Sequence, residues 1–128
     1  MALLVPNVGE TKMLDLILNN ATQGDVKLHL YSDDITPAEA DTVASYTLVT
    51  DPAAKTLTGA SWDTTTTAGT ASYAQQTFTY TAAGTAYGYI VTDNAGTTLL
   101  WAEKFTDGPY TIPSGGGTIK VTPQISLD

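Results

Sequence analysis

Short runs of alternating apolar and polar residues recur about every ten residues along most of this chain, and polar or glycine-containing turns separate them. The run DVKLHLYSDD places Val26, Leu28 and Leu30 on one side of an extended segment, and Lys27, His29 and Tyr31 on the other, water-facing side. The run YAQQTFTYT does the same with Phe78 and Tyr80. Pro123 interrupts the last run, so we expect that strand to lie at an edge or to bend there. This pattern predicts an all-β fold, an antiparallel β-sandwich or barrel of the jelly-roll or immunoglobulin-like kind.

Residue usage supports one such domain. Threonine occupies 24 of the 128 positions, and its branched side chain suits a pleated surface. A chain of this length can bury a sizeable core without disulfides. We therefore expect a single β domain over residues 21–128, preceded by an N-terminal arm or short helix over residues 1–20.

The N-terminal twenty residues are the least strand-like part of the chain. The run ALLV ends at Pro6, and GETKMLDLILNN then shows a helical period, although Leu16 blurs it and leaves a strand as the alternative. We expect neither a signal peptide nor a membrane-spanning segment here, and hence a soluble protein made in a cytoplasm. The apolar side chains of this arm are candidates for an interface: Leu3, Leu4, Val5, Leu14, Ile17 and Leu18.

The stretch YGYIVTDNAGTTLLWAEKF, residues 87–105, predicts a hairpin that turns at Asp93-Asn94-Ala95-Gly96. Strict alternation would put Tyr87 with Tyr89 on one face, and Leu99 with Trp101 on one face. Both faces of this hairpin are mostly apolar, so we expect both to be covered, either within the domain or, on one side, by another chain. The second reading makes these rings interface candidates: Tyr87, Tyr89, Trp101 and Phe105.

Charge excludes several classes of partner. The net charge is −8, and the chain has no arginine, so binding to phosphate backbones of nucleic acids is not expected. The chain also has no cysteine, which removes disulfides, thiolate nucleophiles and cysteine metal sites.

No residue pattern in the chain predicts catalysis. His29 is the single histidine and falls on the polar, water-facing side of its strand, so we interpret it as a surface residue. Asp33-Asp34, with Glu39 and Asp41, lacks a calcium-loop spacing, and the glycines at 115–117 lack the ending of a phosphate loop. We expect no catalytic residue, no metal, no cofactor and no enzymatic activity.

Carbohydrate binding is the small-ligand alternative. Trp62, Trp101 and several tyrosines could stack on sugar rings, although most rings in a small β domain belong to the core.

Several stretches of the chain resemble small structural proteins of tailed bacteriophages. The stretches that carry this resemblance are LLVPNVGETKMLDLILNN, LHLYSDDITPAEADT, AAKTLTGASW, YGYIVTDNAGTTLLWAEKF and IKVTPQISLD. The resemblance implies a virion protein, first a capsid decoration (cement) protein on the outer capsid surface. Its partners would be the major capsid protein and copies of itself, as a trimer or dimer. The alternative is a tail or fibre component, or a module that binds glycans or a host surface.

Overall fold

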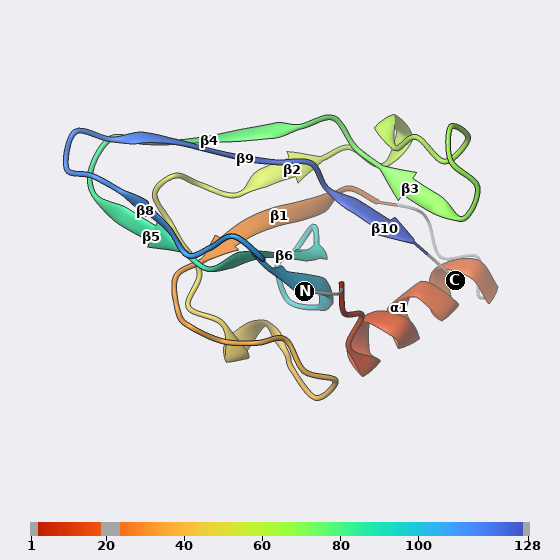
Figure 1. Ribbon diagram of the computed structural model, residues 1–128. Helices are drawn as coiled ribbons and strands as arrows, with labels where there is room; N and C mark the ends of the chain where they lie inside the picture. The colour runs from red at the N-terminus through yellow and green to blue at the C-terminus, as the bar shows by residue number, and fades with distance from the viewer. Residues whose placement is uncertain (1–2, 19–23, 127–128) are drawn as a thin grey trace.

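Antiparallel strands dominate the computed structural model, which describes residues 3–18 and 24–126, with side chains for residues 3–13 and 24–126 (Figure 1). The predicted all-β fold is confirmed, and the choice between a sandwich and a barrel stays a prediction. In chain order the elements are α1 (Asn7–Leu18), β1 (Val26–Tyr31), the 3-10 helix η1 (Val43–Ser45), β2 (Lys55–Leu57), the 3-10 helix η2 (Gly59–Ser61), β3 (Thr70–Ser72), β4 (Gln76–Tyr80), β5 (Gly84–Ala86), β6 (Gly88–Asp93), β7 (Leu99–Lys104), β8 (Tyr110–Ile112), β9 (Gly117–Val121) and β10 (Gln124–Ser126).

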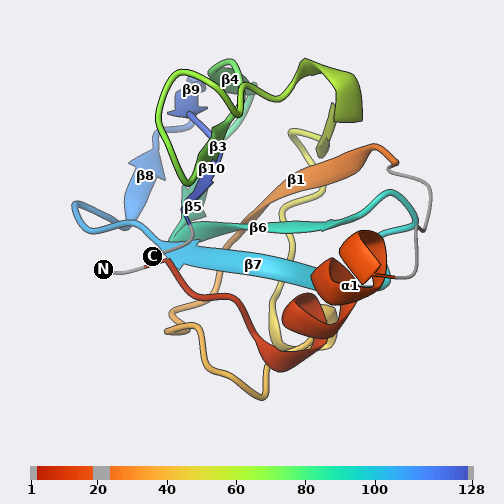
Figure 2. The same ribbon diagram turned by 90° about the vertical axis from the view of Figure 1, so that its right-hand side faces the viewer.

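Four strands form the largest sheet, in the order β2-β1-β6-β7 (Figure 2). The predicted hairpin is present as β6 and β7, and its turn contains Gly96 at a φ of 76°. The Asp93 carboxylate accepts hydrogen bonds from the backbone N–H groups of Thr97 (2.8 Å) and Thr98 (3.1 Å). These bonds satisfy donors that a tight turn would leave without partners, and they hold the hairpin in register.

The remaining strands form one long bent ribbon of two antiparallel strands. Its three paired segments are β3 with β10, β4 with β9, and β5 with β8. Between the β3–β10 and β4–β9 segments, one strand advances by four residues, from Ser72 to Gln76. The opposite strand advances by only three, from Val121 to Gln124. The unequal lengths bend the ribbon at Pro123, where the sequence predicted an interrupted strand.

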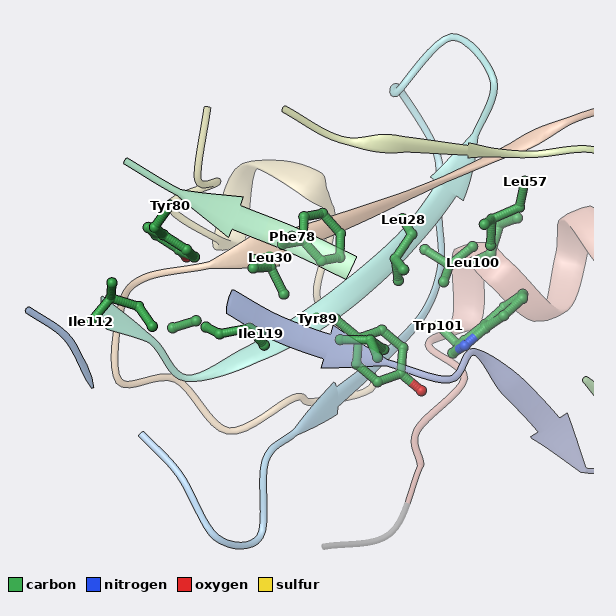
Figure 3. Close-up of a cluster of buried hydrophobic side chains, with 13 residues drawn as sticks. Leu28, Leu30, Leu57, Phe78, Tyr80, Tyr89, Leu100, Trp101, Ile112 and Ile119 are labelled. Carbon is green, nitrogen blue, oxygen red and sulfur yellow. The ribbon is translucent and has the colours of Figure 1, made fainter. Parts of the chain in front are cut away.

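The main core lies between the ribbon and one face of the four-stranded sheet (Figure 3). Phe78 is fully buried, and fully burying a side chain of this size contributes about 1.5–3 kcal/mol. The alternating burial of β4 confirms that Phe78 and Tyr80 share the inner face. The buried members of this core are Leu28, Leu30, Leu57, Phe78, Tyr80, Ala86, Tyr89, Val91, Leu100, Trp101, Ile112, Ile119 and Val121.

A second buried cluster lies on the opposite face of the same sheet. It contains Tyr31, Tyr46, Ile90, Leu99 and Ala102, and residues of the 32–50 segment cover it. The rings of Tyr31 and Tyr46 lie 4.9 Å apart. The expectation that the hairpin is covered on both sides is therefore confirmed. The expectation that Tyr31 faces water is wrong, because the loop after β1 folds back over that face.

A β-bulge changes which side chains share a face in β7. Val91 pairs with Trp101 and Thr92 pairs with Leu99, so Leu100 is an extra residue in the ladder. Leu100 and Trp101 consequently both join the main core, and Leu99 joins the second cluster. The predicted grouping of Leu99 with Trp101 is wrong for this reason.

The N-terminal segment packs along the free edge of β7. The predicted helix is present as α1 and begins two residues before the predicted GETK stretch. It approaches β7 so closely that a Cβ on Gly9 would lie 2.1 Å from the Leu100 carbonyl oxygen. The predicted domain boundary at residue 20 lies outside the described residues. Within the part of the chain described above, no helix has the length and apolarity needed to cross a membrane.

Candidate functional site

The arm residues predicted as an interface contact the body of the same chain. Leu3 and Val5 are partly buried against the main core, and Leu4 is also partly buried. Leu4 forms an isolated antiparallel bridge with Ala102. The side chains of Leu14, Ile17 and Leu18 lie outside the described residues.

The rings predicted as an interface on the hairpin divide between core and surface. Tyr89 and Trp101 are only 4% and 5% exposed, so neither presents its ring on the outside of this chain. The Tyr89 hydroxyl donates a hydrogen bond to Glu103 Oε2 (2.9 Å), and burial, followed by the charge of Glu103, raises the pKa of Tyr89. Tyr87 packs partly buried on the second cluster, and Phe105 packs partly buried on the main core.

One surface nevertheless combines the arm with the end of the hairpin. Because Leu4 pairs antiparallel with Ala102, Leu3 lies on the side of Glu103, toward the Phe105 end of β7. The Phe105 ring contacts the ring of Tyr110 at 5.0 Å, and Tyr110 is 38% exposed. We call Leu3, Phe105 and Tyr110 the edge patch. No sequence pattern pointed to Tyr110, because β8 joins the patch only through the pairing of the bent ribbon.

A pocket of about 460 Å³ opens at the end of the fold where the β3–β10 segment, α1 and the β6–β7 turn meet. Figure 1 shows α1 and the β3–β10 segment at the same end of the molecule. The residues that line the pocket are Lys12, Met13, Gly24, Asp25, Val26, Trp62, Thr64, Ala71, Asp93, Asn94, Ala95, Leu100, Trp101 and Ile125.

Both tryptophans of the chain line this pocket. Their rings lie 5.9 Å apart at an interplanar angle of 68°, an edge-to-face contact. Trp62 is partly buried and also contacts the ring of Tyr73 at 5.2 Å. The Tyr73 hydroxyl accepts a hydrogen bond from the Thr58 backbone N–H (3.0 Å), which fixes this aromatic wall. Sequence analysis singled out both tryptophans but gave no sign that they form one site.

Two carboxylates at the pocket are held by the backbone. Asp25 Oδ1 accepts a hydrogen bond from the Gly59 N–H (3.2 Å). Asp93 is held by the hydrogen bonds of its turn, and although burial opposes the shift, the bonds from Thr98 and Thr97 lower its pKa. The carboxylates are therefore fixed in orientation, and Asp93 stays charged to lower pH than an ordinary aspartate.

With this geometry established, we compared the chain with known proteins. No protein-family model, no curated protein and no solved structure matches it. The function is therefore inferred from the residues of the chain itself.

The acidic residues after β1 serve the loop that covers the second cluster. Asp33 Oδ1 accepts a hydrogen bond from the Thr47 N–H (3.1 Å), and Asp34 forms an ion pair with Lys104. Asp41 Oδ2 accepts hydrogen bonds from the Ala38 N–H and the Tyr46 hydroxyl, each at 2.8 Å. Among the described residues, no three His, Asp or Glu side chains gather as metal ligands.

The position of His29 also differs from the sequence prediction, which made it a surface residue. It is partly buried, and its Nε2 lies 3.1 Å from the hydroxyl of Thr92, a fully buried residue. Burial, followed by the charge of Lys27, lowers the pKa of His29. The imidazole is therefore neutral in the folded protein near pH 7.

Proposed function

We propose that this protein is a structural component of a tailed-phage virion, a decoration or cement protein that binds the outer capsid surface and stabilises the shell. The proposal assigns it two partners, the major capsid protein and further copies of itself in a dimer or trimer. It is made in the host cytoplasm and ends on the virion. The sequence resemblance to small virion proteins supports this proposal, since the stretches that carry it are spread from residue 3 to residue 128.

The position of the edge patch is the observation that carries the proposal. Tyr110 and Val8 are the large hydrophobic residues that the described surface exposes most, at 38% and 39%. The exposed Tyr110 ring contacts the Phe105 ring. Phe105 directly follows β7, the edge strand along which the arm lies. Exposed aromatic rings beside partly buried aliphatic side chains are typical anchors of protein interfaces.

Modest affinity at each copy is sufficient for this role. An interface anchored by one or two rings loses part of its binding free energy to the ordering of both partners. A decoration protein that is itself a dimer or trimer binds several shell subunits at once, and its contacts then reinforce one another through high effective concentration. The edge patch therefore does not need to be large to hold the protein on a shell.

Point variants test this proposal better than deletion of the arm. Removing residues 1–18 should abolish attachment to the shell, but it also removes Leu3, Val5 and Met13 from the main core. Tyr110→Ser changes the exposed ring of the edge patch and leaves the core intact, and Val8→Ser changes an equally exposed side chain outside the patch and should leave binding unchanged. We expect Tyr110→Ser to weaken co-sedimentation with phage heads that lack the protein at least about tenfold, equal to about 1.4 kcal/mol.

Thr111→Ser is the matched control, because Thr111 is an exposed neighbour of Tyr110 in the same strand. It should bind heads like the unmodified protein. The proposal fails if folded Tyr110→Ser binds heads as strongly as the control, or if the unmodified protein binds no heads at all.

A tail or fibre component is the second candidate within the same class of proteins. It would use the same edge patch against a different virion protein. Labelling the protein in intact particles and imaging them by electron microscopy separates the two, since density on the head supports decoration and density on the tail supports the alternative.

A further inference from the structure

We propose that the pocket lined by Trp62 and Trp101 binds one or two rings of a neutral saccharide. This inference goes beyond shell attachment, because the pocket lining and the edge patch share no residue. A pocket of about 460 Å³ falls within the usual range for small-ligand sites, which is about 300–1,000 Å³.

The walls of the pocket suit the apolar face of a sugar ring. Trp62 and Trp101 contribute indole rings, and Val26, Leu100 and Ile125 contribute aliphatic side chains. The C–H groups on one face of a pyranose carry a weak positive charge, which the negative face of an aromatic ring attracts. Trp101 is almost fully buried and forms a rigid inner wall, and Trp62 retains exposed surface for contact with a ligand.

The polar lining suits the hydroxyl groups of the same ring. Asp25, Asp93 and Asn94 add carboxylate and amide groups to the pocket. A carboxylate has about four acceptor positions, so the backbone bonds that orient Asp25 and Asp93 leave further positions for ligand hydroxyls. Asn94 is exposed at the turn, and its amide both donates and accepts.

The charge of the pocket selects a neutral ligand. Among the described residues, two carboxylates, those of Asp25 and Asp93, line it against one ammonium group, that of Lys12. The chain as a whole carries a net charge of −8. A phosphate, a uronic acid or a sialic acid would meet repulsion from both sources, whereas an uncharged saccharide would not.

Intrinsic fluorescence provides a direct test, because both tryptophans of the chain line the pocket. The full-length protein is titrated with glucose, galactose, N-acetylglucosamine and their β- and α-linked disaccharides. We expect at least one of these to change the tryptophan emission in a saturable way, with a dissociation constant of about 1 mM or tighter. Isothermal titration calorimetry with the same sugar should give the same constant.

Variants at the wall and at the polar lining link that signal to the pocket. Asn94→Ala and Asp25→Asn leave both indoles in place and should weaken binding at least about tenfold by calorimetry. Trp62→Ala should abolish binding, and circular dichroism shows whether it is folded. Asp107→Asn is the control, since Asp107 is exposed and does not line the pocket.

The proposal is overturned if no neutral saccharide changes the emission or produces heat. It is also overturned if sugar binding persists unchanged in both Asn94→Ala and Asp25→Asn, or if only apolar peptides bind. Phage-head co-sedimentation of Asn94→Ala separates this inference from the proposed function, because that variant should still attach to heads.

Discussion

Leu4 and Ala102 exchange both of their backbone hydrogen bonds, at 3.1 Å from the Leu4 N–H and 3.0 Å from the Ala102 N–H. This single bridge places the N-terminal arm along the outer edge of β7. An unpaired edge strand is a site where other chains add strands, so the arm protects this edge within its own chain. The arm of a neighbouring copy could make the same pairing, so the next experiment tests whether the arm pairs with β7 of its own chain.

A pair of cysteines tests whether the arm pairs within the chain. The chain has no cysteine, so Leu4→Cys with Ala102→Cys introduces the only two thiols. Directly hydrogen-bonded antiparallel residues have Cα atoms about 5.5 Å apart, within the range that a disulfide spans. After mild oxidation we expect an intramolecular disulfide, seen as a monomer with altered mobility on a non-reducing gel and a mass loss of two hydrogens.

The single variant Leu4→Cys is the control, because it can form no link within one chain. A covalent dimer of the double variant at low protein concentration, with no intramolecular product, would show that the arm pairs with a second copy.

Gly9 should tolerate no side chain. A Cβ there would lie 2.1 Å from the Leu100 carbonyl oxygen, and backbone atoms on both sides cannot move independently. We expect Gly9→Ala to reduce the free energy of unfolding by about 1–3 kcal/mol, as overpacking usually does. Urea denaturation measures this loss. Gly115→Ala, where no atom lies within 4 Å of the added Cβ, should change stability by less than about 0.5 kcal/mol, and equal losses in the two variants would contradict the close packing of α1 on β7.

Asp93 should be the main side-chain determinant of the hairpin turn. Its carboxylate accepts hydrogen bonds from two backbone N–H groups and from the Thr97 hydroxyl. We expect Asp93→Ala to cost about 1–3 kcal/mol in thermal or urea unfolding, because two backbone donors lose their partner. Asp107→Ala, a change at an exposed aspartate in the next turn, should cost much less. A stable Asp93→Ala variant would mean that the turn backbone alone holds the hairpin.

His29 should make stability depend on pH near neutrality. Burial and Lys27 lower its pKa in the folded state below the ordinary value of 6.5. Well above pH 6.5 the imidazole is neutral in both the folded and the unfolded state, so it does not change the free energy of unfolding. As the pH falls below 6.5, the unfolded chain binds the proton first, so the free energy of unfolding should decrease until the folded imidazole also titrates.

Urea denaturation at intervals from pH 7.5 to 5.5 measures this dependence, and His29→Gln is the comparison. Because His29 is the only histidine, the variant should show a nearly flat profile over this window. A profile of the unmodified protein that rises toward lower pH would be inconsistent with the buried position of His29.

Local signals were sufficient for several elements. Strand β1, the alternating strand β4, the hairpin turn at Asp93 and the interruption at Pro123 all follow from residues that are near one another in the sequence. Alternation and turn chemistry act over two to five residues, which is why they can be read directly.

The errors share a different physical origin. The bulge at Leu100 places Leu99 and Trp101 on opposite faces of the sheet, because one extra residue shifts the two-residue alternation of side chains. The 32–50 segment buries Tyr31, although the alternation of β1 alone would place Tyr31 on the water-facing side of the strand.

The sequence by itself determined the all-β class, strands β1 and β4, the hairpin turn at Asp93 and the absence of arginine and cysteine chemistry. Only the tertiary structure decided which apolar faces are core, where the arm lies and that Trp62 and Trp101 form one pocket. The reason is that these features depend on contacts between segments far apart in the chain. Such contacts are selected by the packing of the whole molecule, and the local pattern of any one strand is compatible with several of them.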